Sequence, residues 1–130
     1  MCRPLITSQC ICIGGFEVIL DGYTPEKTLK SGSPQVPLGG TVILVCRTVG
    51  LPYGTEVGYS WTCPGDWRDP CNLGNGKNPN RKIYNDILVI NIISPSGDQG
   101  PYTCKVNAND LGQNGSRVDL IISGKFYIFM

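Results

Sequence analysis

Apolar and polar residues alternate along several short segments of this chain. An apolar residue at every second position indicates a β-strand with one face turned toward a core. The residues that we expect to face inward are Val42, Leu44 and Cys46; Tyr59, Trp61 and Cys63; Tyr102, Cys104 and Val106; and Val118, Leu120 and Ile122. Each set predicts one strand.

Shorter or more continuous apolar runs predict the remaining strands. Residues 16–20 form a run that we expect to end at Asp21-Gly22, and residues 81–85 form a short strand. Residues 87–93 are apolar almost throughout, which is typical of a well-buried strand.

Turn-forming residues recur between these segments at intervals that suit short strands. Residues 24–37 are polar and punctuated by Pro and Gly, as a connection or an edge segment would be, and residues 65–80 form a loop. Asn114-Gly115 is expected to turn the chain into its last strand. With no helical period, about seven short strands predict an all-β sandwich or barrel.

The composition excludes several functional classes. Histidine is absent, which removes Ser-His and Cys-His catalysis and the commonest metal ligand. A net charge of +1 is too small to attract nucleic acid or an anionic membrane. No apolar run is long enough to cross a bilayer as a helix. The motifs of serine hydrolases and phosphate-binding loops are also absent. We therefore expect no enzyme activity, no cofactor and no metal.

Seven cysteines without histidine favour disulfides over a zinc site. Four of them fall in the patterned part of the chain, at Cys46, Cys63, Cys71 and Cys104. The other three lie in the first dozen residues, at Cys2, Cys10 and Cys12. Disulfides in the first group indicate an oxidising compartment, so we expect an extracellular or cell-surface protein.

The spacing of Cys46, Trp61 and the segment Asp98-Gln99-Gly100-Pro101-Tyr102-Thr103-Cys104 resembles that of an immunoglobulin-like domain. The resemblance covers residues 16–123. It implies a two-sheet antiparallel β-sandwich with Greek-key connections, in which a Cys46–Cys104 bridge joins the sheets and Trp61 packs against it. It also implies that the Tyr102 hydroxyl holds a corner, that Leu88 and Ile90 lie in the core, and that Ile93 completes their apolar triplet ahead of Asp98.

The resemblance implies two further details. The short distance from Trp61 to Cys104, and the lack of a Phe-Gly-x-Gly motif, make an intermediate-set or constant-like domain a closer match than an antigen-receptor variable domain. Asp98 is expected to form a salt bridge at the corner with Arg81, for which Lys82 is the alternative.

Cys63 and Cys71 lie within short reach across one loop, so we expect them to form the second bridge. The loop between them presents Trp67 and Arg68, residue types that dominate interface energetics. Trp67 and Arg68 are therefore candidate contacts to a protein partner. The alternative is that Trp67 folds over its own disulfide.

Two other features bear on recognition. Ile43 and Val45 should point away from the core and belong either to a contact face or to a surface that the first strand or the N-terminal tail covers. Asn114-Gly115-Ser116 is a sequon for an N-linked glycan, which makes Asn114 a candidate glycosylation site.

The two ends differ in composition from the central part. Residues 1–15 are expected to be an N-terminal tail or a weak signal-like segment, and residues 124–130 an apolar tail. Removal of the first segment would leave an even set of cysteines, whereas its retention favours linkage of these thiols to another chain.

The sequence thus favours a non-catalytic recognition or adhesion module at the cell surface, either by itself or as a fragment of a larger receptor. It would bind a protein partner, either a second copy or another protein, through a sheet face or through the loop between Cys63 and Cys71. A structural spacer in a receptor or adhesion ectodomain is the alternative.

Overall fold

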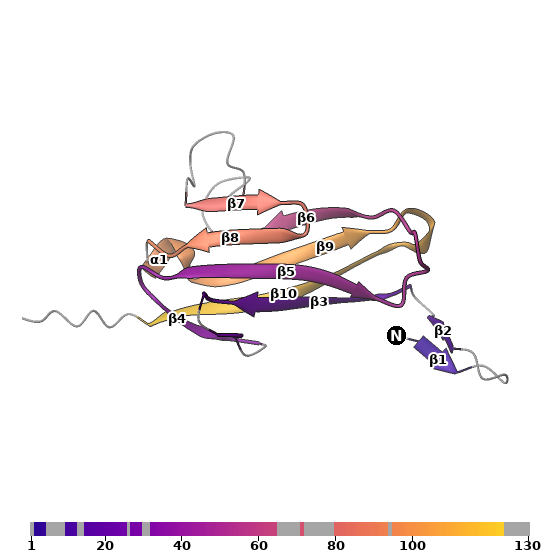
Figure 1. The fold of residues 1–130 in the computed structure, drawn as a ribbon, viewed down its shortest axis with the longest axis horizontal. Helices are drawn as coiled ribbons and strands as arrows, with labels where there is room; N and C mark the ends of the chain where they lie inside the picture. Colours follow the sequence, from indigo (N-terminus) through magenta and orange to yellow (C-terminus); the bar gives the residue numbers. More distant parts are fainter. Residues whose placement is uncertain are drawn as a thin grey trace, which may run out of the picture.

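The computed structural model describes residues 2–4, 10–12, 15–25, 27–29, 32–64, 71, 80–93 and 95–123. Two four-stranded sheets pack face to face, and a small antiparallel hairpin of β1 (Cys2–Pro4) and β2 (Cys10–Cys12) lies beside them (Figure 1). In that hairpin Cys2 is opposite Cys12 in the backbone register. The side chains of Cys2, Cys10 and Cys12 lie outside the part of the chain that the structure describes, so their bonding stays a prediction.

The first sheet has the strand order β3-β5-β8-β7, and all its neighbouring strands are antiparallel. The strands are β3 (Glu17–Tyr23), β5 (Thr41–Val49), β8 (Ile87–Asn91) and β7 (Arg81–Tyr84). The β7–β8 connection is the tight turn Asn85-Asp86, where Asn85 has a φ of 60°.

The second sheet has the strand order β4-β10-β9-β6. The strands are β4 (Gln35–Pro37), β10 (Gln113–Ser123), β9 (Gly100–Asn107) and β6 (Gly58–Thr62). β10 pairs antiparallel with β9 and β9 with β6, but β4 pairs with β10 in parallel. The sandwich predicted from the sequence is confirmed, and among the described strands this parallel edge pair is the one departure from the antiparallel arrangement.

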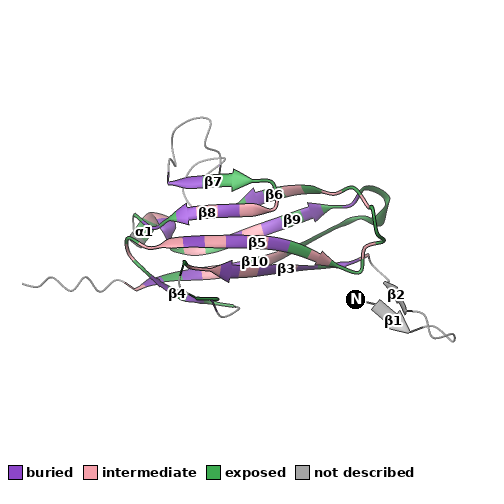
Figure 2. Ribbon diagram, in the orientation of Figure 1, coloured by how far each residue is buried: buried purple, intermediate pink, exposed green. Residues whose placement is uncertain are grey.

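The core lies between the two sheets and is built by the alternating residues of both. Burial alternates along the strands, as Figure 2 shows on β5 and β8, because successive side chains point to opposite faces. The predicted inward residues that are fully or nearly fully buried are Val42, Leu44, Cys46, Trp61, Cys63, Tyr102, Cys104, Val106, Val118, Leu120 and Ile122. Leu88 and Ile90 of the expected triplet are buried as well, but the expectation for Ile93 is wrong, because Ile93 is 63% exposed and Ile92 is the buried residue. Tyr59 is only half-buried.

The expected end of the first strand at Asp21-Gly22 is wrong, because β3 continues through both residues to Tyr23. Gly22 is buried, and a Cβ there would lie 3.1 Å from Leu29 Cδ1. Glycine at this position allows close packing against Leu29 and is not part of a turn. The chain turns later, where the Thr24 backbone N–H donates to the Lys27 carbonyl at 2.8 Å.

The expected turn at Asn114-Gly115 is also wrong, because both residues lie within β10 and pair with Val106 and Lys105. The turn comes earlier, in the 3₁₀ helix Asn109–Leu111, with Asn109 at a φ of 54° and Gly112 at 92°. A second departure is that β8 ends at Asn91, and a one-turn helix α1 (Pro95–Asp98) leads into β9.

Candidate functional site

The centre of the sandwich is held by the disulfide between Cys46 on β5 and Cys104 on β9, which are both buried. Trp61 is directly opposite Cys104 in the β6–β9 register and is only 8% exposed. Its indole Nε1 donates a hydrogen bond to the Asn85 carbonyl at 3.0 Å. Trp61 therefore joins the second sheet to the β7–β8 turn of the first.

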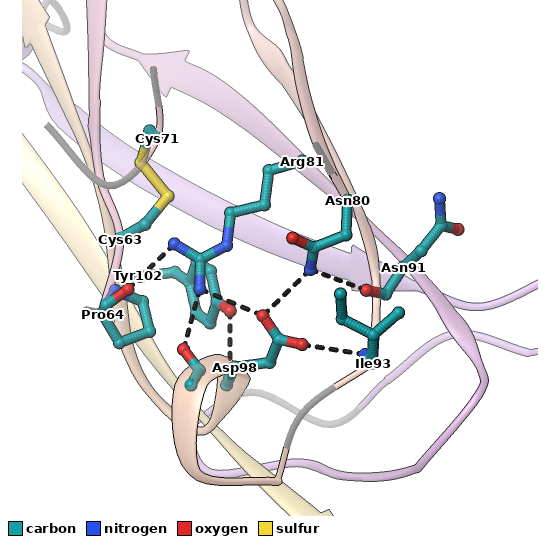
Figure 3. Close-up of polar contacts among 10 residues, drawn as sticks. Cys63, Pro64, Cys71, Asn80, Arg81, Asn91, Ile93, Asp98 and Tyr102 are labelled. Atoms are coloured by element: carbon teal, nitrogen blue, oxygen red, sulfur yellow. Dashed lines mark hydrogen bonds and ion pairs between the residues drawn. A yellow bond between two sulfur atoms is a disulfide. The ribbon is translucent and has the colours of Figure 1, made fainter. Parts of the chain in front are cut away.

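At one end of the sandwich, Asp98 forms a buried ion pair with Arg81 (Figure 3). Arg81 Nη2 lies 3.0 Å from Asp98 Oδ1, and the two side chains are 2% and 3% exposed. Asp98 Oδ1 also accepts from Asn80 Nδ2 at 3.0 Å, and Oδ2 accepts from the Ile93 backbone N–H at 2.8 Å. Arg81, rather than the exposed Lys82, is the basic residue of this corner.

Arg81 also reaches the residue that follows Cys63. Its Nη1 donates to the Pro64 carbonyl at 2.8 Å and its Nη2 to the Gly97 carbonyl at 2.8 Å. The Cys63–Cys71 disulfide is present and buried beside these contacts (Figure 3). The start of the loop is thus fixed both by a covalent bond and by a charge-assisted hydrogen bond.

The candidate contacts Trp67 and Arg68 lie outside the described residues. The Cys63–Cys71 bridge and the Arg81–Pro64 contact fix where their loop leaves the sandwich. The backbone acceptors that Arg81 uses, Pro64 and Gly97, could not be recognised in the sequence, because every residue carries a carbonyl.

Tyr102 closes the same corner from β9. Its hydroxyl donates to the Asp98 backbone carbonyl at 2.7 Å, and the Arg81 guanidinium lies over its ring at 5.6 Å from the centroid. Burial raises the pKa of the Tyr102 hydroxyl well above its ordinary value of 10.0, and nearby Asp98 adds to this effect while Arg81 opposes it. The folded chain therefore keeps this hydroxyl protonated in alkaline solution.

We predict that Tyr102 makes the fold sensitive to alkali. Above the ordinary pKa of 10.0 the unfolded chain releases the Tyr102 proton and the folded chain keeps it, so the free energy of unfolding falls as pH rises. The slope from this group approaches about 1.4 kcal/mol per pH unit. Urea unfolding of the Tyr102→Phe variant between about pH 8 and pH 11 should show a shallower decline than the parent chain.

Tyr53→Phe is the matched control, because Tyr53 is fully exposed. It should leave the alkaline decline unchanged. Equal slopes for the parent chain and Tyr102→Phe would contradict the prediction.

The outer faces of the two sheets differ in chemistry. On the first sheet, Ile43 is opposite Val89 and Val45 is opposite Ile87, and all four side chains are half-buried and point away from the core. We call these four residues the aliphatic face. The sequence pointed to Ile43 and Val45 but not to Ile87 and Val89, because the nearly continuous apolar run 87–93 predicts a well-buried strand.

The outer face of the second sheet is polar by contrast. Its outward positions alternate with buried core residues and are mainly polar, with Ser60, Thr62, Thr103, Lys105, Arg117 and Asp119. Pro101 and Ile121 are the apolar residues among them. Solvent-facing strands normally carry polar residues in this way. The aliphatic face is therefore a property of the first sheet and not of the sandwich in general.

Asn114, the glycosylation candidate, is exposed on β10. Its side-chain Nδ2 donates a hydrogen bond to the Phe16 carbonyl, and its Oδ1 accepts from the Gly115 N–H at 2.8 Å. The amide nitrogen that would carry a glycan thus also links β10 to the residue that precedes β3.

Among the described residues, no group of three or more His, Cys, Asp or Glu side chains is placed to hold a metal ion. No helix in the described part of the chain is long and apolar enough to cross a membrane.

No family model and no curated protein matches this sequence. Solved structures do match. Extracellular domains 3–5 of Drosophila OTK superpose with a TM-score of 0.53 at 17% identity, over 79% of this chain and 32% of that one. The tandem immunoglobulin repeats of Dlar give 0.52 at 19% identity, over 84% of this chain and 47% of that one. Domain 1 of VCBP3 from Branchiostoma floridae gives 0.52 at 20% identity, over 85% and 99%.

This chain has the fold of an immunoglobulin-like domain. It spans less than two thirds of the length of the OTK and Dlar chains. One sheet has the four strands β3-β5-β8-β7, and the other has β6, β9 and β10. A constant-type immunoglobulin domain divides its seven strands between two sheets in the same way. Here β4 is an additional strand beside β10. Among the described strands, none lies beyond β6, where a variable-type domain continues its sheet.

Proposed function

We propose that this chain is a non-catalytic recognition module of an extracellular or cell-surface protein, and that it binds a protein partner through the aliphatic face. Residues 16–123 form the module in this proposal, and residues 1–15 and 124–130 are tails. The observation that carries the proposal is the contrast between the aliphatic outer face of the first sheet and the polar outer face of the second.

The extracellular location is supported by the two disulfides, which form and persist in oxidising compartments. The sequon at Asn114 fits the same location, and we propose that Asn114 carries a glycan. One of the solved neighbours, OTK, is described as consisting of extracellular domains. The absence of histidine from the sequence supports a non-catalytic role.

Recognition is supported by the arrangement of the aliphatic face. Its four β-branched side chains occupy neighbouring positions on two adjacent strands, so they form one patch rather than scattered apolar residues. A contiguous apolar patch with polar neighbours is typical of an interaction site. Val45 belongs to this patch and has Asp21 of β3 on one side and Ile87 of β8 on the other.

Labelled chain should bind to cells that display its partner, and Val45→Lys should reduce this binding by about tenfold or more, because a lysine amine would be buried in an apolar contact. Flow cytometry over a range of chain concentrations measures the effect. Thr62→Lys, which places the same side chain on the polar outer face, is the matched control and should bind as the parent does.

Trp67→Ala separates the two candidate surfaces. Loss of binding in Trp67→Ala, with full binding in Val45→Lys, would transfer recognition to the loop between Cys63 and Cys71. Full binding by both variants would contradict the proposal, and absence of binding by the parent chain would favour a structural spacer. Thermal unfolding of each variant checks that the fold is retained.

A further inference from the structure

The N-terminal hairpin brings three cysteines to one face of a small sheet. β1 and β2 form a two-stranded sheet of their own, and their register places Cys2 opposite Cys12 and Pro4 opposite Cys10. Residues two apart in a strand share a face of the sheet, and so do residues directly opposite each other. Cys2, Cys10 and Cys12 are therefore on the same face of the hairpin.

The backbone register distinguishes between the pairs that these cysteines could form. Residues directly opposite each other in an antiparallel pair have Cα atoms about 4.5–5.5 Å apart, and a disulfide needs a Cα separation of about 4.4–6.8 Å. Cys2 and Cys12 meet this requirement. Cys2 and Cys10 are diagonal neighbours, for which the separation is about 7–8 Å, so a bond between them would require the backbone to move.

The third pair, Cys10 and Cys12, is separated by one residue along β2. In an extended strand, Cβ atoms two positions apart are about 6.6 Å from each other. A disulfide needs a Cβ separation of about 3.5–4.5 Å. A bond between Cys10 and Cys12 would therefore have to bend the strand, which leaves Cys2 and Cys12 as the pair that the hairpin accommodates without a change of backbone.

We propose that Cys2 and Cys12 form a third disulfide, which closes the hairpin at its outermost pair of residues. The inference rests on the oxidising location in the proposed function and adds a modification to it. The sequence has seven cysteines, of which Cys46–Cys104 and Cys63–Cys71 take four. Cys10 is then the one cysteine left without a partner in the chain, and only its thiol remains for linkage to another chain.

The small size of the hairpin supports a covalent link. Each strand has three residues, and in the described part of the chain neither strand pairs with a strand of the sandwich. A two-stranded hairpin by itself is only marginally stable in water. A disulfide stabilises a closed loop mainly by restricting the unfolded chain, so it supplies stability that three residue pairs cannot.

The chain that follows the hairpin is fixed against one end of the sandwich (Figure 1). Gly15, three positions after Cys12, has a φ of 98°, and a Cβ there would lie 2.7 Å from the Leu111 carbonyl oxygen. The Phe16 carbonyl accepts a hydrogen bond from Asn114 Nδ2. The bridged hairpin therefore ends close to a fixed point beside the β9–β10 turn.

The bond forms by two exchanges with a small disulfide such as oxidised glutathione. The thiolate of one cysteine attacks the glutathione disulfide and releases one reduced glutathione. The thiolate of the other cysteine then attacks the mixed disulfide and releases the second. Together the two cysteines lose two protons and two electrons, which the glutathione disulfide gains.

The first experiment counts free thiols in the whole chain after refolding in a glutathione redox buffer. Free thiols are alkylated under denaturing, non-reducing conditions and counted by intact mass. Cys10→Ser should carry no alkylated thiol, whereas Cys2→Ser and Cys12→Ser should each carry two, because each has lost one half of the bridge. Two alkylated thiols in Cys10→Ser, or none in either of the other variants, overturns the inference.

The second experiment tests the register itself. In the Cys10→Ser background, Ile11→Cys together with Cys12→Ser moves the cysteine by one position, to the residue opposite Arg3 and onto the other face of the hairpin. Both chains are titrated with mixtures of reduced and oxidised glutathione. The bridge to Cys12 should withstand a mixture at least about tenfold more reducing than the shifted variant does, and equal resistance to reduction would contradict the assigned pair.

The outcomes separate this inference from the proposed function. The intact mass of the secreted parent chain shows whether the hairpin is kept, and a chain that begins near Phe16 overturns the inference. Recognition through the aliphatic face is then still tested by Val45→Lys. Conversely, a Cys2–Cys12 bridge in a chain that binds no cells would keep the bridge and contradict the proposed function.

Discussion

Replacement of Arg81 by alanine should lower the free energy of unfolding by about 3–5 kcal/mol, because it leaves a buried carboxylate without its cation. The Asp98 side chain is only 3% exposed and receives a charged donor from Arg81. The same change removes the donors to the Pro64 and Gly97 carbonyls. Urea unfolding followed by tryptophan fluorescence measures the loss.

Lys82→Ala is the matched control, because Lys82 is the next residue and points to solvent. Its effect should stay within about 0.5 kcal/mol. The Arg81→Ala, Asp98→Ala double variant should lose less stability than the two single losses added together, because neither group is then buried alone. A loss from Arg81→Ala as small as that from Lys82→Ala would contradict the role assigned to this ion pair.

The choice between Arg81 and Lys82 shows what the sequence could and could not predict. Both residues are basic and adjacent, so composition and spacing left both possible. Strand pairing decides between them, because Arg81 is opposite Ile90, which is buried, and Lys82 is opposite Val89, which faces outward. A one-residue change of register would have exchanged their roles.

The inward residues of the main strands were predictable because side-chain direction in a strand depends only on parity. Turns were less predictable, because a dipeptide that often forms a turn, such as Asn-Gly, can also lie within a strand. Asn114-Gly115 lies in β10, since the left-handed residues Asn109 and Gly112 have already turned the chain. Gly22 was taken for a turn because its packing against Leu29 depends on contacts that form only in the folded chain.

The sequence predicted two of the four residues of the aliphatic face. Ile43 and Val45 alternate with buried residues of β5, so their outward direction follows from the sequence. Ile87 and Val89 lie in a nearly continuous apolar run, and such a run does not reveal which of its faces is covered. The β5–β8 register placed these two residues beside the first two and turned isolated outward positions into one surface.

The Cys46–Cys104 bridge should contribute more to stability than the Cys63–Cys71 bridge. The two cysteines of the first are separated by 58 positions and those of the second by 8. In the chain-entropy account, closing the longer loop restricts the unfolded chain by roughly 4 kcal/mol and closing the shorter one by about 2.5 kcal/mol. The Cys46→Ala, Cys104→Ala variant should therefore lose the larger part of a small domain's stability.

The packing around the two bridges increases the difference between their contributions to stability. Cys46 and Cys104 are 1% and 0% exposed at the centre of the core, and Trp61 is opposite Cys104, so removal of both sulfur atoms also leaves a cavity beside the indole. Urea unfolding of the Cys46→Ala, Cys104→Ala and the Cys63→Ala, Cys71→Ala variants compares the two bridges directly. If the second variant were the less stable, the loop and not the inter-sheet bridge would be the main covalent support of the sandwich.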